Sequence, residues 1–148
     1  MGSGPLEDSL KDLQEKLGLK NLHFYETLSK AEMPDVLAGV DVSVIPLRKL
    51  DLFKGAIPSK IFESLAMKKP ILLGVEGEAK DLFITEGNCG LAFEPENEVE
   101  LAEKIVLLSG DPSKCKILGE NARQFAELKF NRERIAEEFH EALLKMKI

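Results

Sequence analysis

The stretch "IPSKIFESLAMKKPILLGV" (residues 57–75) combines a polar start led by a proline, a helical pattern and an apolar run. Pro58 suits the first position of a helix, where its fixed φ and missing N–H cost little. The apolar residues that follow recur at helical spacing, and the run from 70 to 75 is typical of a strand. The stretch therefore predicts a helix at 58–68 followed by an apolar strand.

Periodicity extends this interpretation to the rest of the chain. The segment "SKAE" (29–32) has the spacing of a capping box, and an N-cap residue precedes two of the later helices. Strands separated by single helices predict an α/β fold with a mostly parallel sheet and right-handed crossovers. We expect one unit over 1–148, with strands at 21–26, 41–47, 70–75 and 90–95 and helices at 5–17, 58–68, 77–87, 97–108, 112–128 and 131–146, besides a short helix after 32.

Composition excludes several classes of function. The net charge of −6 argues against a basic surface for nucleic acid or anionic membranes. Cys89 and Cys115 lie far apart and lack the spacing of a zinc site or a disulfide framework, which fits a reducing cytoplasm. No apolar run approaches the ~18 residues of a spanning helix, and the first residues do not have the pattern of a signal peptide. We expect a cytoplasmic protein.

Three polar segments are expected to meet at one edge of the sheet. In open parallel sheets, ligands bind beyond the carboxyl ends of the strands, and the segments 26–30, 46–60 and 74–79 fall there. The amides of Ser59, Lys60 and Ile61 follow Pro58 and are expected to have no partner within the helix. Free amides and the helix dipole form an anion site, to which the Lys60 side chain adds a positive charge.

Glu63 lies one turn further into the same helix. A carboxylate at this position is able to accept two hydroxyl hydrogen bonds from a ribose. Its apolar neighbours in sequence predict a crowded apolar environment for the carboxylate, which favours a bound partner. The alternative is that Ser59 and Lys60 are ordinary helix-start residues and Glu63 is simply solvated; both interpretations stay open at this point.

The segments "PSKIFESLAMKKPILLG" and "GEAKDLFITEGNCGLAFEPENEVELAEKI" together resemble the C-terminal, donor-binding domain of retaining GT-B glycosyltransferases of the group 1, family 4 type. Within this family, the chain resembles bacterial enzymes of surface-polysaccharide biosynthesis. The resemblance covers nearly the whole chain in order, including "MPDVLAGVDVSVIPL" and "FNRERIAEEF". It implies a Rossmann-like sheet flanked by helices, with helices 112–146 as part of the domain. It also implies transfer of a hexosyl or acetamidohexosyl group from a nucleotide sugar, expected to be UDP-linked, to a polysaccharide or a lipid-linked acceptor.

The resemblance also assigns residues to the donor. It implies that Glu63 binds the ribose and that Pro58, Ser59 and Lys60 surround the diphosphate. The base is expected near Leu28. The family typically has a second glutamate that contacts the transferred sugar, and Gly55 occupies that position here. No catalytic residue is assigned, and neither a metal nor a cofactor is expected besides the donor itself.

The family domain begins with two further strands and follows an acceptor-binding N-terminal domain, and neither is found in this sequence. We therefore expect the chain alone to be inactive, and any peripheral contact with a membrane to be made by the acceptor domain. Without the first two strands, the family strand order, 3-2-1-4-5-6, would leave one edge of the strand at 41–46 unpaired. Either 21–26 pairs beside it, or a second copy joins near Val42 and Val44; we expect the second outcome.

Two other functions remain possible from the sequence. A nucleotide-sugar epimerase uses a similar cleft between two domains, and its catalytic residues would lie outside this segment. A non-enzymatic α/β interaction domain would not bind nucleotides.

Overall fold

The computed structural model describes residues 4–146, which form two compact units. The first unit ends at Val36 and the second begins at Leu37. The first unit contains helix α1 (Glu7–Leu17), which ends where Gly18 adopts the left-handed conformation with φ 64°. The helix predicted at 5–17 is confirmed, although it begins at Glu7, two residues later than expected.

The segment 21–26 is not a strand, and this prediction is wrong. It is an irregular segment in which the backbone carbonyl of Leu22 accepts a hydrogen bond from the Gln14 side chain of α1. Lys11 lies 6.0 Å from the centre of the Phe24 ring. Alternating side chains alone do not make a strand, because its backbone also needs a neighbouring strand as partner. The sheet of the second unit has three strands, and 21–26 is not one of them.

The capping box predicted at residues 29–32 is present. The backbone N–H and the hydroxyl of Ser29 both donate to the Glu32 carboxylate, at 3.0 Å and 2.7 Å. These hydrogen bonds lower the pKa of Glu32 from its usual value. They precede helix α2 (Met33–Ala38), which confirms the short helix expected after residue 32.

The second unit is built on a parallel sheet of three strands in the order β1-β2-β3. These are β1 (Ser43–Pro46), β2 (Ile71–Gly74) and β3 (Gly90–Ala92). Val44 lies opposite Leu72, and Leu72 lies opposite Leu91. Strand β2 has a neighbour on both sides and is buried throughout, which explains its unbroken apolar sequence. Three of the four predicted strands and the parallel sheet are confirmed, and within residues 4–146 the outer edge of β1 has no strand beside it, as expected.

The connection from β1 to β2 contains a 3₁₀ helix, η1 (Asp51–Gly55), and helix α3 (Lys60–Ala66). Helix α3 is two residues shorter at its start than predicted. The connection from β2 to β3 contains one turn of α-helix, α4 (Glu78–Lys80), and a π-helical segment, η2 (Asp81–Glu86). The helix predicted at 77–87 is thus present but changes its hydrogen-bond pattern midway.

Side chains from the two faces of the sheet enter two apolar clusters. Ile71, Leu73 and Val75 belong to a cluster with residues of α3 and with Phe83 of η2. Leu72, from the opposite face, packs with Leu108 and Leu118 of the later helices. Alternate side chains of one strand therefore anchor helices on both sides of the sheet, as expected for an α/β fold.

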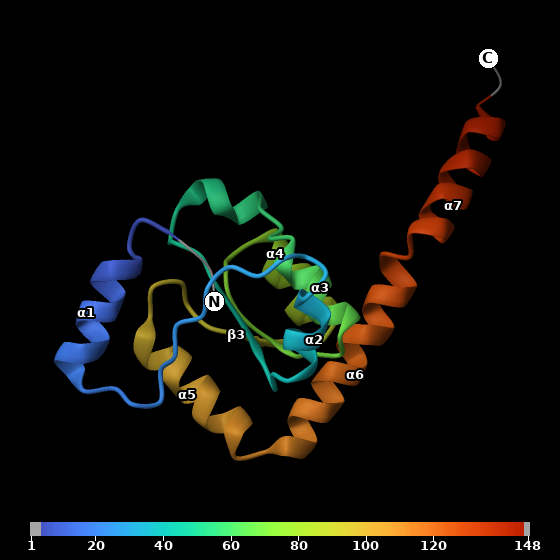
Figure 1. The fold of residues 1–148 in the computed structure, drawn as a ribbon. Coiled ribbons are helices and arrows are strands. Elements are labelled where there is room, and N and C mark those ends of the chain that lie inside the picture. The colour runs from blue at the N-terminus through green and yellow to red at the C-terminus, as the bar shows by residue number, and fades with distance from the viewer. Residues whose placement is uncertain (1–3, 147–148) are drawn as a thin grey trace. The chain divides into compact units, whose positions relative to one another are not determined.

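Three helices complete the second unit: α5 (Glu98–Ser109), α6 (Pro112–Lys129) and α7 (Arg132–Lys145). Asn97, Asp111 and Asn131 cap their starts by accepting backbone N–H hydrogen bonds. The predicted positions of these helices are confirmed. Helix α7 extends away from the sheet and buries none of its residues (Figure 1). Among residues 4–146, no helix has both the length and the apolar character needed to cross a membrane.

Gly77 fixes the turn that follows β2, and its replacement should destabilise the protein. Its φ of 76° is rarely adopted by residues with a Cβ, and a Cβ would collide with the backbone of Lys54. We expect Gly77→Ala to lower the free energy of unfolding by roughly 1–3 kcal/mol, measured by urea denaturation. The control is Gly110→Ala, where φ is −82° and the nearest atom to a new Cβ is 3.5 Å away. Equal stability of the two variants would contradict this role of Gly77.

Candidate functional site

The start of helix α3 lies at the carboxyl edge of the sheet. Strands β1 and β2 are parallel, so the chain that leaves β1 must return along α3 before it enters β2. The first turn of α3 is therefore close to the ends of both strands, together with residues 47–59 and the turn 75–77. This is the edge where open parallel sheets bind their ligands.

Helix α3 divides its side chains between the core and solvent. Ile61, Ser64 and Leu65 are buried, and the Ser64 hydroxyl donates to the backbone carbonyl of Lys60 at 2.9 Å. Ser59, Lys60 and Glu63 are exposed. Residues three and four apart share a helix face, so Glu63 lies one turn behind Ser59 and Lys60. The structure thus brings together three of the predicted site residues.

The surroundings predicted for Glu63 are wrong. Its carboxylate is not enclosed by apolar side chains, because Ile61 and Leu65 face the core while Glu63 faces solvent. Within residues 4–146 no hydrogen bond or ion pair occupies the Glu63 carboxylate or the Lys60 ammonium group. These charged groups are available to a ligand without the loss of an existing interaction.

The backbone at the start of α3 also differs in part from the prediction. The amide of Ile61 is not free, because it donates to the carbonyl of Pro58 at 3.1 Å. The amide of Phe62 donates to the carbonyl of Ser59, also at 3.1 Å. Pro58 lies before the helix rather than at its first position, and the Ser59 hydroxyl does not cap the helix. Fewer amides are therefore available to an anion than the sequence predicted. Anion binding at this helix start would depend more on the charge of Lys60.

Other cations near this edge already have partners. Lys49 donates to Glu94, and this hydrogen bond is the main reason that the pKa of the Glu94 carboxyl lies below its usual value. Lys54 lies 2.7 Å from Asp51, which raises the pKa of the lysine. Arg48 is only loosely paired, with Glu96 at 3.9 Å. All these groups are exposed, so their ion pairs are weak and exchangeable.

The turn after β2 packs against the segment 51–55. Gly77 packs directly against the backbone of Lys54, which holds η1 against the end of β2. The role of Gly77 was not predicted from the sequence, although a glycine soon after an apolar strand is a common turn signal. Gly55 ends η1 and is open: nothing lies within 4 Å of a Cβ placed there.

The remaining predicted site residue and the cysteines lie elsewhere. Leu28 belongs to the first unit, whereas the other site residues belong to the second. Burial raises the pKa of the Cys89 thiol to about 12, so this thiol is not a nucleophile at neutral pH. In the part of the chain that the structure describes, no group of three or more histidine, cysteine, aspartate or glutamate side chains is arranged to hold a metal ion.

Solved structures share this fold. Sucrose-phosphate synthase from Thermosynechococcus elongatus superposes with a TM-score of 0.79 at 21% identity, covering 98% of this chain and 37% of that protein. HepE from Anabaena, solved in complex with UDP-glucose, gives a TM-score of 0.76 at 24% identity over 94% of this chain and 36% of its own. The chain spans little more than a third of either structure.

Sequence comparisons identify the family. A probable glycosyltransferase from Pseudomonas aeruginosa, WbjE, is 33% identical over 106 residues, which cover 71% of this chain and 26% of that relative. The family model described as glycosyl transferases group 1 matches residues 1–125. With most of its length matched in this way, the chain belongs to the group 1 glycosyl transferases.

Proposed function

We propose that the chain is the donor-binding part of a retaining glycosyltransferase and binds a nucleotide sugar at the start of helix α3. The observation that carries this proposal is the exposed, unpaired set of Ser59, Lys60 and Glu63 at the carboxyl edge of the sheet. A phosphate-binding cation one helical turn from a hydroxyl-binding carboxylate matches the layout of a nucleoside diphosphate. Family membership supports the same assignment.

Each group has a distinct role in this proposal. The Glu63 carboxylate accepts hydrogen bonds from the two ribose hydroxyls. The ammonium group of Lys60 and the hydroxyl of Ser59 bind the diphosphate, and Pro58 shapes the turn that presents them. Because the whole chain carries a charge of −6, attraction of a phosphate depends on this local cation rather than on the overall field.

The identity of the donor is proposed from similarity. The related fold of HepE was solved with UDP-glucose, which supports a uridine nucleotide linked to a hexosyl or acetamidohexosyl group. The base is proposed to lie near Leu28 and the sugar near Gly55, whose open surroundings leave room for a ligand. The proposed acceptor is a polysaccharide or a lipid-linked sugar. Family membership favours a transferase over an epimerase or a non-enzymatic domain.

We also propose a cytoplasmic location and an acceptor-binding domain as partner. The two cysteines are free thiols in the structure, which fits a reducing compartment. The chain spans 26% of the length of WbjE, and the related structures are also much longer. An acceptor domain would supply the groups that complete the transfer and any contact with a membrane.

Replacing Glu63 tests the ribose contact. We expect weak binding of UDP by the unmodified chain, in the high micromolar range or above, and roughly tenfold weaker binding by Glu63→Gln, since hydrogen bonds to a charged group contribute ~1.5–3 kcal/mol. NMR titration with UDP gives both the affinity and the amides that shift. Glu120→Gln, an exposed glutamate of α6, is the control and should bind like the unmodified chain. Shifts that avoid residues 55–63, or equal affinity of the Glu63 variant, would contradict the assignment.

Replacing Lys60 separates the diphosphate from the ribose. Lys60→Gln should weaken the binding of UDP more than that of UMP, because UMP lacks the second phosphate. Glu63→Gln should weaken both nucleotides by a similar factor. Titrations of both ligands with both variants measure this difference. The exposed Lys80 of α4 offers a matched control, Lys80→Gln, with no expected change. An equal effect of Lys60→Gln on the two nucleotides would place the diphosphate elsewhere.

The chain of 148 residues should bind a donor without using it. We expect no detectable hydrolysis or transfer of UDP-glucose, UDP-galactose or their N-acetyl derivatives, because the proposed acceptor groups are not present. A coupled assay for released UDP measures this directly. Turnover that survives further purification and is lost in Glu63→Gln would show that the chain carries a complete transfer site, and the division of labour proposed above would be wrong.

A further inference from the structure

The turn between β3 and α5 has a glutamate at a position that favours glycine. The backbone N–H of Asn97 donates to the carbonyl of Glu94 at 3.0 Å, which closes a four-residue turn. Pro95 is its second residue, and Glu96, the third, has a φ of 65°. A proline followed by a residue with positive φ is the pattern of a type II turn, whose third position favours glycine. A residue with a Cβ rarely takes this conformation, which points to a role for the Glu96 side chain.

The Glu96 side chain contacts the segment that leaves strand β1. Its carboxylate accepts a hydrogen bond from the backbone N–H of Lys49 at 3.2 Å and lies 3.9 Å from the Arg48 guanidinium group. The ammonium group of Lys49 donates to Glu94 of the same turn. Two residues of the turn therefore hold two consecutive residues of the segment. We call these contacts between residues 48–49 and 94–96 the loop clamp.

The clamped segment leads into η1, which is held less firmly than α3. None of the η1 residues is buried, although η1 also packs against the turn at Gly77. Helix α3 is anchored in the apolar core by Ile61 and Leu65. Loss of the loop clamp is therefore expected to release residues 48–55, while Lys60 and Glu63 keep their places on α3.

We propose that Glu96 is a positioning residue for the sugar of a nucleotide-sugar donor and acts through the loop clamp. This inference rests on the proposed function, in which the sugar lies near Gly55 at the end of η1. Glu96 does not touch the donor in this arrangement. Its carboxylate holds the backbone of Lys49, and the path of the chain from Lys49 through η1 determines where residues 51–55 meet the sugar. The ribose and the diphosphate contact α3 and do not depend on the loop clamp.

Backbone relaxation measured by NMR tests the loop clamp without a ligand. The heteronuclear NOE of amides 48–55 should fall in Glu96→Gly and in Glu96→Ala, because neither variant offers an acceptor to the Lys49 N–H. Glu96→Gln keeps an acceptor oxygen and should restore most of the rigidity. Glu96→Gly should also unfold less readily than Glu96→Ala, by roughly threefold in the equilibrium constant, since glycine adopts this φ freely. A segment that is equally rigid in all these variants would overturn the proposal.

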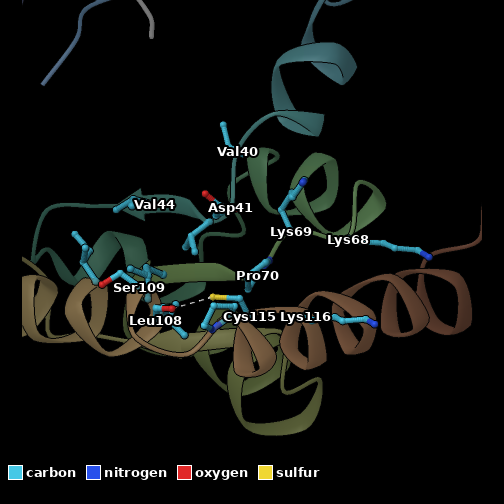
Figure 2. Close-up of a pocket in the computed structure, with 14 residues that line it drawn as sticks. Val40, Asp41, Val44, Lys68, Lys69, Pro70, Leu108, Ser109, Cys115 and Lys116 are labelled. Atoms are coloured by element: carbon cyan, nitrogen blue, oxygen red, sulfur yellow. Dashed lines mark hydrogen bonds between the residues drawn. The ribbon is translucent and has the colours of Figure 1, made fainter. Parts of the chain in front are cut away.

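Lys68→Gly is the matched control. Lys68 also has a positive φ, of 56°, but it follows α3 at the opposite edge of the sheet. It lines a pocket with residues of β1, α5 and α6, which Figure 2 shows, and no residue of that pocket belongs to 47–56 or to the turn 94–97. The control removes a Cβ from a similar backbone conformation. It should leave residues 48–55 rigid and nucleotide binding unchanged.

Titrations with UDP and UDP-glucose test the role of Glu96 toward the donor. Glu96→Gly should weaken the binding of UDP-glucose by roughly threefold or more and change the affinity for UDP by less than about twofold. Glu96→Gln should recover most of the affinity for UDP-glucose. An equal effect on the two nucleotides, or an unchanged affinity for UDP-glucose, would overturn the positioning role while the proposed function stands. An unmodified chain that binds neither nucleotide would overturn the proposed function and this role together.

Discussion

The pairing of β2 with a parallel strand on each side is the constraint on which the second unit depends. Because the strands are parallel, every connection leaves one strand at the carboxyl edge of the sheet and returns to the opposite edge before the next strand begins. Alternate side chains of β2 are buried on opposite faces, with Leu73 in one apolar cluster and Leu72 in the other. Strand β2 has a neighbouring strand at each edge and an apolar cluster on each face. Its position therefore determines where α3 begins, and with it the place of the proposed phosphate and ribose contacts.

The electrostatics of the proposed site follow from which charges are left unpaired. Near the carboxyl edge, Lys49 and Lys54 are engaged by Glu94 and Asp51. Lys60 and Glu63 make no such pair within the described residues. An acidic protein does not attract a diphosphate by its overall field, so in the proposed site the local charge of Lys60 supplies the attraction. Lys60 and Glu63 are three residues apart on one helix face, so in the proposed site one turn separates the diphosphate contact from the ribose contact.

Periodicity and capping residues were sufficient to predict most of the second unit. Asn97, Asp111 and Asn131 cap helix starts through local hydrogen bonds. Capping residues of this kind can be recognised from the sequence alone. The prediction of a strand at 21–26 was wrong because a strand depends on a partner strand that lies elsewhere in the chain. The prediction of a free amide at Ile61 was wrong because a turn precedes α3, and in it the Ile61 amide donates to the carbonyl of Pro58. The exposure of Glu63 could not be inferred from its apolar neighbours, since helix neighbours in sequence point in different directions.

The central claim is that a nucleoside diphosphate binds at the start of helix α3. A crystal structure of the chain soaked with millimolar UDP tests this claim most directly. The account predicts that the ribose hydroxyls lie within hydrogen-bond distance of the Glu63 carboxylate, with the diphosphate against Ser59 and Lys60. Nucleotide density at another edge of the sheet, or a ribose that contacts no residue of α3, would contradict it.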